Sequence, residues 1–181
     1  VVRWPGHIKP GTVKNQMFSA LDWLPTLVNV AGGPKGGALK KQIEAGTYPG
    51  IRKTTLDGVD QADYLEGKSE KSAREVFFYY TGSQPSAVRY KNWKLYYTMV
   101  PDTATGGLYG ATSYHWTQLA NIKRDPFEQT VGADAKSLLG YAGSIGSPST
   151  AYLYDWNILP IGQMLWYQEL MSYRTFPPLQ A

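Results

Sequence analysis

"EVFFYYT" at residues 75–81, "PSAVRYKNWKLYYTMV" at residues 85–100 and "HWTQLANI" at residues 115–122 share one composition. All three are rich in Val, Phe, Tyr and Trp, the residue types that β-strands favour. A turn at Tyr90 to Asn92 divides the second segment into two strands. Strands that follow one another without intervening helices pair in an antiparallel sheet, so the sequence predicts a small antiparallel sheet of about four strands.

The segments after this sheet predict a turn, a connector and a helix. Asp125-Pro126 begins a turn that closes the sheet, because proline cannot donate a ladder hydrogen bond. The Gly- and Ser-rich stretch "GYAGSIGSPST" at residues 140–150 reads as a connector. "LPIGQMLWYQELMSYRTF" at residues 159–176 is helical in pattern and apolar on two sides, which predicts a terminal helix packed between two layers.

The segments before the sheet predict a strand, a helix and a loop. "VVRWPGHIKPG" at residues 1–11 resembles a strand entered halfway that runs into Pro-Gly turns. "FSALDWLPTLVNVAGG" at residues 18–33 has helical spacing, with Asp22 as the expected cap and Pro25 in the first turn. Residues 33–55 predict a long surface loop with one short helical turn at Leu39 to Glu44.

Residues 57–75 predict a turn, a short helix around Gln61 to Leu65 and a charged, exposed linker. Taken together, these elements predict an α+β fold in two parts. Residues 1–56 form a strand-helix piece of a larger α/β domain, and residues 57–181 form a subdomain of antiparallel sheet plus terminal helix.

Composition narrows the classes of function. The 181 residues carry a formal net charge of +4, and the basic residues are scattered along the chain, which argues against a nucleic-acid binder. Zero cysteines exclude disulfides and thiolate metal sites. No apolar run is long enough to predict a membrane span.

The residues show no catalytic constellation. Of the two histidines, His7 lies in a Pro-Gly turn and predicts a structural role, whereas His115 borders a long loop and a strand and is the better site candidate. The pairs Asp57/Asp60 and Glu66/Glu70 could hold a metal, but a turn and a solvated helix end explain them better.

The aromatic strands allow two interpretations. Exposed rings bind the faces of sugars, whereas rings on alternating strands pack at least half inward, and the core interpretation is favoured. The rings concerned are Tyr79, Tyr80, Tyr90, Trp93, Tyr96, Tyr97, Tyr114 and Trp116.

The order of these pieces carries a resemblance. "RWPGHIKPG", "SALDWLPTLVNVAG", "LDGVDQADYLEG", "REVFFYY", "AVRYKNWKLYY" and "NIKRDPFEQ" follow one another as in the C-terminal part of the type I sulfatases, the arylsulfatase family, within the alkaline-phosphatase-like superfamily. The closing "YDWNILPIGQMLWYQELMSYRTFPPLQ" is similar to the terminal helix of a bacterial subgroup. The residue 33–55 insert and the loop at 101–113 depart from the family pattern.

The resemblance implies a sulfate-ester hydrolase whose chemistry lies before Val1. Its formylglycine motif, C/S-x-P-x-R, is absent here, so formylglycine and calcium are expected in an N-terminal catalytic part and no catalytic or metal residue on this chain. The family's pocket-mouth loop matches "VPDTATGGLYGATSYHW", which makes Tyr109, Tyr114 and His115 candidates for substrate binding, with a covering loop as the alternative.

We therefore expect a C-terminal sulfatase fragment, inactive alone, in a periplasmic or secreted enzyme, with a cytoplasmic one left open. Its partners would be the catalytic part and a sulfate ester, or a second copy of the chain through exposed apolar surface. A glycan-binding module and a piece of a phosphate-ester hydrolase are the alternatives.

Overall fold

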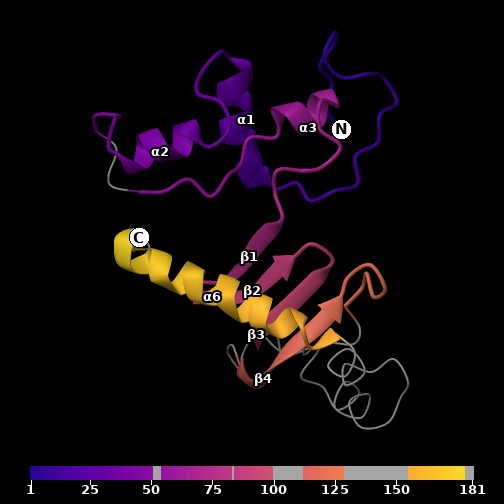
Figure 1. The fold of residues 1–181 in the computed structure, drawn as a ribbon, viewed down its shortest axis with the longest axis vertical. Coiled ribbons are helices and arrows are strands. Elements are labelled where there is room, and N and C mark those ends of the chain that lie inside the picture. The colour runs from indigo at the N-terminus through magenta and orange to yellow at the C-terminus, as the bar shows by residue number, and fades with distance from the viewer. Residues whose placement is uncertain (51–53, 83, 100–111, 129–154, 178–181) are drawn as a thin grey trace. The chain divides into compact units, whose positions relative to one another are not determined.

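The computed structural model describes residues 1–50, 54–82, 84–99, 112–128 and 155–177, with only the backbone of residues 99 and 112–116. The chain forms two compact units, Val1–Glu75 and Val76–Ala181. The boundary predicted at residue 56 concerns the domains of a larger parent protein and stays a prediction. The mixture of helices with an antiparallel sheet confirms the predicted α+β class (Figure 1).

The first unit is helical. A short 3-10 helix η1 (Ala20–Asp22) leads into α1 (Trp23–Val30), followed by α2 (Ala38–Glu44) and α3 (Ala62–Glu66). The Ser19 side chain accepts from the Leu21 N–H, and the Asp22 carboxylate accepts from the Ser19 N–H, a reciprocal cap that starts η1. Pro25 falls in the first turn of α1, where no N–H is required.

Two expectations for the first unit are wrong. Residues 1–18 form turns and irregular segments and no strand, because a strand needs a neighbour for its backbone hydrogen bonds and the described part of this unit supplies none. The linker before residue 75 is not uniformly exposed, since Ser72 and Arg74 are each 8% exposed. The short helices at residues 38–44 and 62–66 agree with the sequence pattern.

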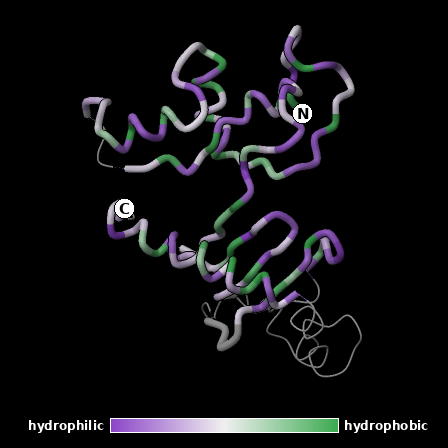
Figure 2. Tube along the Cα trace, in the orientation of Figure 1, coloured by the Kyte–Doolittle hydropathy of each residue, from purple (hydrophilic) through white to green (hydrophobic). Residues whose placement is uncertain are grey.

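The second unit is a four-stranded antiparallel meander in the order β1-β2-β3-β4. Its strands are β1 (Val76–Thr81), β2 (Gln84–Tyr90), β3 (Trp93–Met99) and β4 (Thr112–Asn121). The predicted turn at Tyr90 to Asn92 joins β2 to β3, with Tyr90 paired to Trp93. Hydrophobic residues recur along the strands (Figure 2), as a half-buried sheet requires.

The core of this unit lies between the sheet and α6 (Ile158–Thr175), which crosses one face of the sheet (Figure 1). Val88, Leu95 and Leu119 are almost fully buried there, and side chains of α6 and neighbouring strands pack on them: Val76, Phe78, Trp93, Tyr97, Ile158, Leu159 and Leu165. A smaller cluster of Ala87, Tyr96 and Ala120 occupies the opposite face, with Tyr79 packed against it.

Gly162 sets the distance between α6 and the sheet. It is the buried residue of α6, and a Cβ added there would overlap the Cδ2 atom of Leu95 on β3. The opposite side of α6 is exposed: Met164 is 54% and Tyr167 62% exposed. Among the described residues, α6 therefore packs on one layer and not between two.

Candidate functional site

The β3–β4 ribbon contains an irregularity at the end where the sequence predicts a substrate loop. Tyr96 pairs with Gln118, but two residues further along β3, Thr98 pairs with Ser113. Four residues of β4, 114–117, therefore stand opposite the single residue Tyr97 of β3, which is three more than a regular ladder would have. Bulges of this kind interrupt a ladder and redirect side chains, and they recur next to active sites.

The β3 side of this irregularity is held rigidly. The Tyr97 ring stacks on Trp166 of α6 with centroids 3.9 Å apart and planes at 21°. Its neighbour Leu95 is fully buried against Gly162. The helix thus anchors the strand from which the predicted loop departs.

The three predicted substrate-binding residues are placed only in part. Tyr114 and His115 belong to β4, within the stretch that carries the extra residues, and their side chains lie outside the described residues. Tyr109 lies outside the described residues altogether. The strand begins at Thr112, earlier than the sequence suggested, because pairing with Met99 extends it.

The aromatic rings mostly pack inward. Tyr96 is 5% exposed, and Tyr79, Tyr90, Trp93 and Tyr97 are half-buried, whereas Tyr80 is 46% exposed and donates its hydroxyl to Glu169. Trp116, like Tyr114, lies outside the described side chains. The described rings therefore contribute more to packing than to an open sugar platform.

Lys94, Tyr96 and Glu128 form a polar cluster on the sheet face opposite α6. The Lys94 ammonium lies 2.9 Å from both Glu128 carboxylate oxygens and 4.2 Å from the Tyr79 ring centroid. The Tyr96 hydroxyl donates to Glu128, and burial together with this carboxylate raises the pKa of Tyr96. The cluster fixes the turn after β4 to the sheet.

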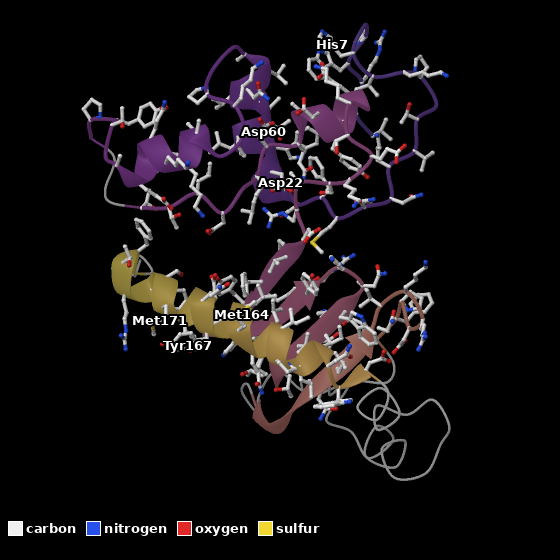
Figure 3. All side chains as sticks on the ribbon, viewed as in Figure 1. His7, Asp22, Asp60, Met164, Tyr167 and Met171 are labelled. Atoms are coloured by element: carbon white, nitrogen blue, oxygen red, sulfur yellow. The ribbon has the colours of Figure 1, made fainter. Side chains whose placement is uncertain are left out.

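A buried ion pair that sequence analysis missed holds the first unit together. The Arg74 Nε atom lies 3.0 and 3.1 Å from the two Asp22 carboxylate oxygens, and its Nη2 atom donates to the Asp57 carbonyl at 2.7 Å. Asp22 is fully buried. Asp22, labelled in Figure 3, is the residue before α1, as predicted, but its carboxylate accepts hydrogen bonds from Arg74 instead of capping α1.

Gln61 and Ser72 extend this network. Gln61 Nε2 donates to Ser72 Oγ at 2.9 Å and to Asp22 Oδ2 at 3.3 Å, and Ser72 Oγ donates to the Met17 carbonyl at 2.6 Å. Burial raises the pKa of Asp22, but hydrogen bonds from Arg74, Val59 and Ser19 outweigh burial and leave that pKa below its usual value. The network is a structural brace, not an exposed reactive group.

Two of the carboxylates that could have held a metal, Asp60 and Glu66, have other partners. Asp60 accepts from the Asn29 amide at 2.7 Å, the Gly36 N–H at 2.8 Å and the Ala62 N–H at 3.0 Å. Glu66 pairs with His7 and Lys68, and Glu70 is exposed. Within the described ranges, no group of three or more His, Cys, Asp or Glu is arranged to bind a metal.

His7 has a structural partner on each side. Its ring stacks on Trp4 with centroids 4.0 Å apart, and its Nδ1 atom lies 2.8 Å from Glu66 on α3 (Figure 3). The Gln16 N–H also donates to the Tyr64 hydroxyl of α3 at 3.0 Å. The irregular segment at residues 1–18 is therefore held against α3 at two points.

One side of η1 and α1 is apolar and exposed. Leu21, Leu24 and Leu27 are 50%, 56% and 57% exposed. They recur at a spacing of three residues, so they lie along one broad side of the helix.

In the described part of the chain, no helix is long and apolar enough to cross a bilayer.

Several curated proteins resemble this chain, and they are sulfatases. Mouse steryl-sulfatase is 32% identical over 119 residues, which cover 64% of this chain and 16% of that protein. Human arylsulfatase A is 37% identical over 86 residues, or 48% of this chain and 13% of the relative. Human arylsulfatase H is 28% identical over 146 residues, which cover 71% of this chain and 23% of that protein. The chain spans less than a quarter of each relative's length.

A solved structure agrees at the level of the fold. The PsFucS1 sulfatase from Pseudoalteromonas sp. superposes with a TM-score of 0.52 and 14% identity, covering 79% of this chain and 26% of that chain. No family model matches.

Proposed function

Because this chain belongs to the sulfatase family, as a C-terminal part of it, we propose that it completes the catalytic domain of a sulfate-ester hydrolase and is inactive alone. The exposed apolar side of α1 carries the proposal. Leu24 and Leu27 each expose more than half of their surface, which is a poor arrangement for a helix in water. A catalytic part that packs against this side would bury it.

The chemistry that the family implies, a formylglycine and a calcium ion, would belong to the catalytic part. The described carboxylates do not fit a calcium site, because Asp22 and Asp60 already accept several hydrogen bonds and Glu66 is paired with Lys68 and His7. No step of the reaction is therefore assigned to this chain. Its contribution would be to support the catalytic part and border the substrate pocket.

The test is a complementation assay with an aryl sulfate substrate. The purified chain should show no turnover, and activity should appear when the catalytic part of the same enzyme is co-expressed with it. The polypeptide encoded before Val1 should contain a C/S-x-P-x-R motif. Turnover by the 181-residue chain alone would contradict the proposal.

We further propose that residues 100–116 border the substrate pocket, with Tyr109, Tyr114 and His115 as contacts. The extra residues of β4 opposite Tyr97 support this, because such irregularities redirect side chains at functional sites. In the intact enzyme, His115→Ala should lower kcat/KM for the natural substrate by about tenfold, the effect of losing one hydrogen bond to a charged group. Unchanged kinetics with several sulfate esters would remove His115 from the site.

Two alternatives make different predictions. A glycan-binding module should bind plain oligosaccharides by itself, which the inward packing of Tyr96 and the half-burial of Tyr79 disfavour. A phosphate-ester hydrolase would hydrolyse aryl phosphates in the complementation assay in preference to aryl sulfates. A periplasmic or secreted location stays a prediction, which fractionation of the source cells would test.

A further inference from the structure

Four basic side chains that are scattered in the sequence meet at one end of the sheet. Arg89 and Lys91 lie at the β2–β3 turn, and Lys123 and Arg124 follow β4. We call these four residues the basic end. Lys91, Lys123 and Arg124 are exposed, and Arg89 is half-buried.

Strand pairing brings these residues together. Trp93 pairs with both Tyr90 and Asn121, and the Ile122 N–H donates to the Asn92 carbonyl at 2.9 Å. These pairs place the turn that contains Lys91 and the turn that contains Lys123 and Arg124 at the same end of the sheet. Asn121 accepts from the Lys123 and Arg124 N–H groups at 3.1 and 3.3 Å, which orders the second turn.

The basic end carries more positive than negative charge: its four basic side chains are accompanied by Asp125, which follows Arg124, and by Glu75, which precedes the β1 residue that pairs with Tyr90. Glu128, a nearby carboxylate, is occupied by the Lys94 ammonium and the Tyr96 hydroxyl. The Arg89 Nε atom donates to the Lys91 carbonyl at 3.0 Å, which keeps its guanidinium beside the turn. Like charges that lie near one another repel, so an anionic ligand that offsets the excess positive charge is favoured at this end.

Lys91 adds a second, independent observation. Its φ is 53°, in the left-handed region that glycine usually occupies in a two-residue hairpin. A lysine is strained at such a position. The Lys91 ammonium lies 4.9 Å from the centroid of the Tyr90 ring, and strain retained at an exposed charged residue is typical of functional sites.

We propose that the basic end binds a sulfated polysaccharide chain. Lysine and arginine side chains bind the sulfate groups, and the nearby Phe127 ring, 81% exposed, offers a face for a sugar ring. The choice of a sulfated ligand rests on the proposed sulfatase function. Duplex DNA is also a polyanion, so it is the competing ligand in the test.

The first test measures binding of the full chain to dextran sulfate, with unsulfated dextran and duplex DNA as comparisons, over a series of salt concentrations. Lys123→Glu with Arg124→Glu should weaken binding at least about tenfold. The slope of the logarithm of the binding constant against the logarithm of the salt concentration should become shallower by about two. The matched control is Lys9→Glu with Lys41→Glu, two exposed lysines of the first unit with the same charge change. The control variant should lose less than about threefold in affinity for dextran sulfate, because the change in net charge acts on the ligand only at long range.

Equal losses in the two double variants would overturn the proposal, because net charge alone would then explain binding. Equal or tighter binding of DNA or unsulfated dextran would overturn it as well. Binding to dextran sulfate is measured on this chain alone, so it can succeed even if the complementation assay fails. Complementation can likewise succeed even if the chain does not bind dextran sulfate.

The second test separates binding from folding at one residue. Lys91→Gly relieves the strain and removes the charge, so it should raise the Tm of the chain while weakening dextran sulfate binding by about threefold to tenfold. A merely structural lysine would give the higher Tm with unchanged affinity. That outcome would remove Lys91 from the site.

Discussion

The Asp22–Arg74 ion pair shows how a single residue organises the first unit. Both side chains are nearly inaccessible to water, with 0% and 7% of their surface exposed. A buried pair contributes little net stability, but the loss of one partner leaves an uncompensated charge in the interior. The pair therefore specifies how η1 packs beside the segment before β1 more than it stabilises the fold.

Asp22→Asn should lower the free energy of unfolding by about 3 kcal/mol, because Arg74 keeps its charge without a carboxylate. Urea unfolding followed by tryptophan fluorescence measures this loss. Asp63→Asn, at an exposed position on α3, is the control and should change the free energy by less than about 0.5 kcal/mol. Similar losses in both variants would show that the pairing of Asp22 with Arg74 is not the cause of the destabilisation.

The same residue predicts a pH dependence. The pKa of Asp22 is lowered in the folded state, so its contribution is fully present above the unfolded value of about 3.9 and is lost as pH falls through the folded pKa. The wild-type chain should therefore lose stability below about pH 4, and Asp22→Asn should lose less over that interval. Parallel pH profiles would assign the acid sensitivity to other carboxylates.

At the scale of elements, the contact between α6 and β3 depends on the missing side chain of Gly162. Gly162→Ala gains about 1 kcal/mol of helix propensity but forces a methyl group into fully buried Leu95, and overpacking costs about 1–3 kcal/mol. We expect a net loss of about 1 kcal/mol. Gln163→Ala, the exposed neighbour, should be neutral or slightly stabilising in the same thermal unfolding experiment.

Coupling to Leu95 identifies the cause. In a Leu95→Ala background the added methyl group enters the space that the leucine leaves, so Gly162→Ala should then be neutral or stabilising. An equal penalty in both backgrounds would show that the helix backbone, and not the contact, is responsible.

Elements with a local signal could be predicted from the sequence, and those that depend on distant partners could not. Aromatic and β-branched runs predicted β1 to β3, and Asp22 with Pro25 marked the start of α1, because these preferences act within a few residues. The burial of Arg74 depends on Asp22, 52 residues away. Nothing near Arg74 in the sequence indicates it.

The candidate sites also depend on partners that are distant in the sequence, so the sequence could not reveal their geometry. A period-two pattern cannot reveal the three extra residues of β4, because they appear only when β4 pairs with β3. The basic residues are scattered in the sequence for a similar reason: Lys91 and Lys123 lie in two turns that come together only through the pairing of β3 with β4. Their gathering limits the use of sequence spacing as evidence against an anionic ligand.

At the scale of the whole molecule, the exposed leucines of η1 and α1 determine how the chain behaves without its proposed catalytic part. An apolar stripe that lacks its natural cover associates with another copy. We therefore expect the isolated chain to form concentration-dependent oligomers, which sedimentation velocity would detect.

Leu24→Gln with Leu27→Gln should render the chain monomeric without lowering its Tm by more than a few degrees, because both side chains are already more than half exposed. The same variant should fail to complement the catalytic part. Met164→Gln with Tyr167→Gln is the matched control, since it removes two apolar side chains from the exposed side of α6 (Figure 3). If that control disperses the oligomers and the leucine variant does not, α6 forms the contact between copies and the exposed side of α1 has another role.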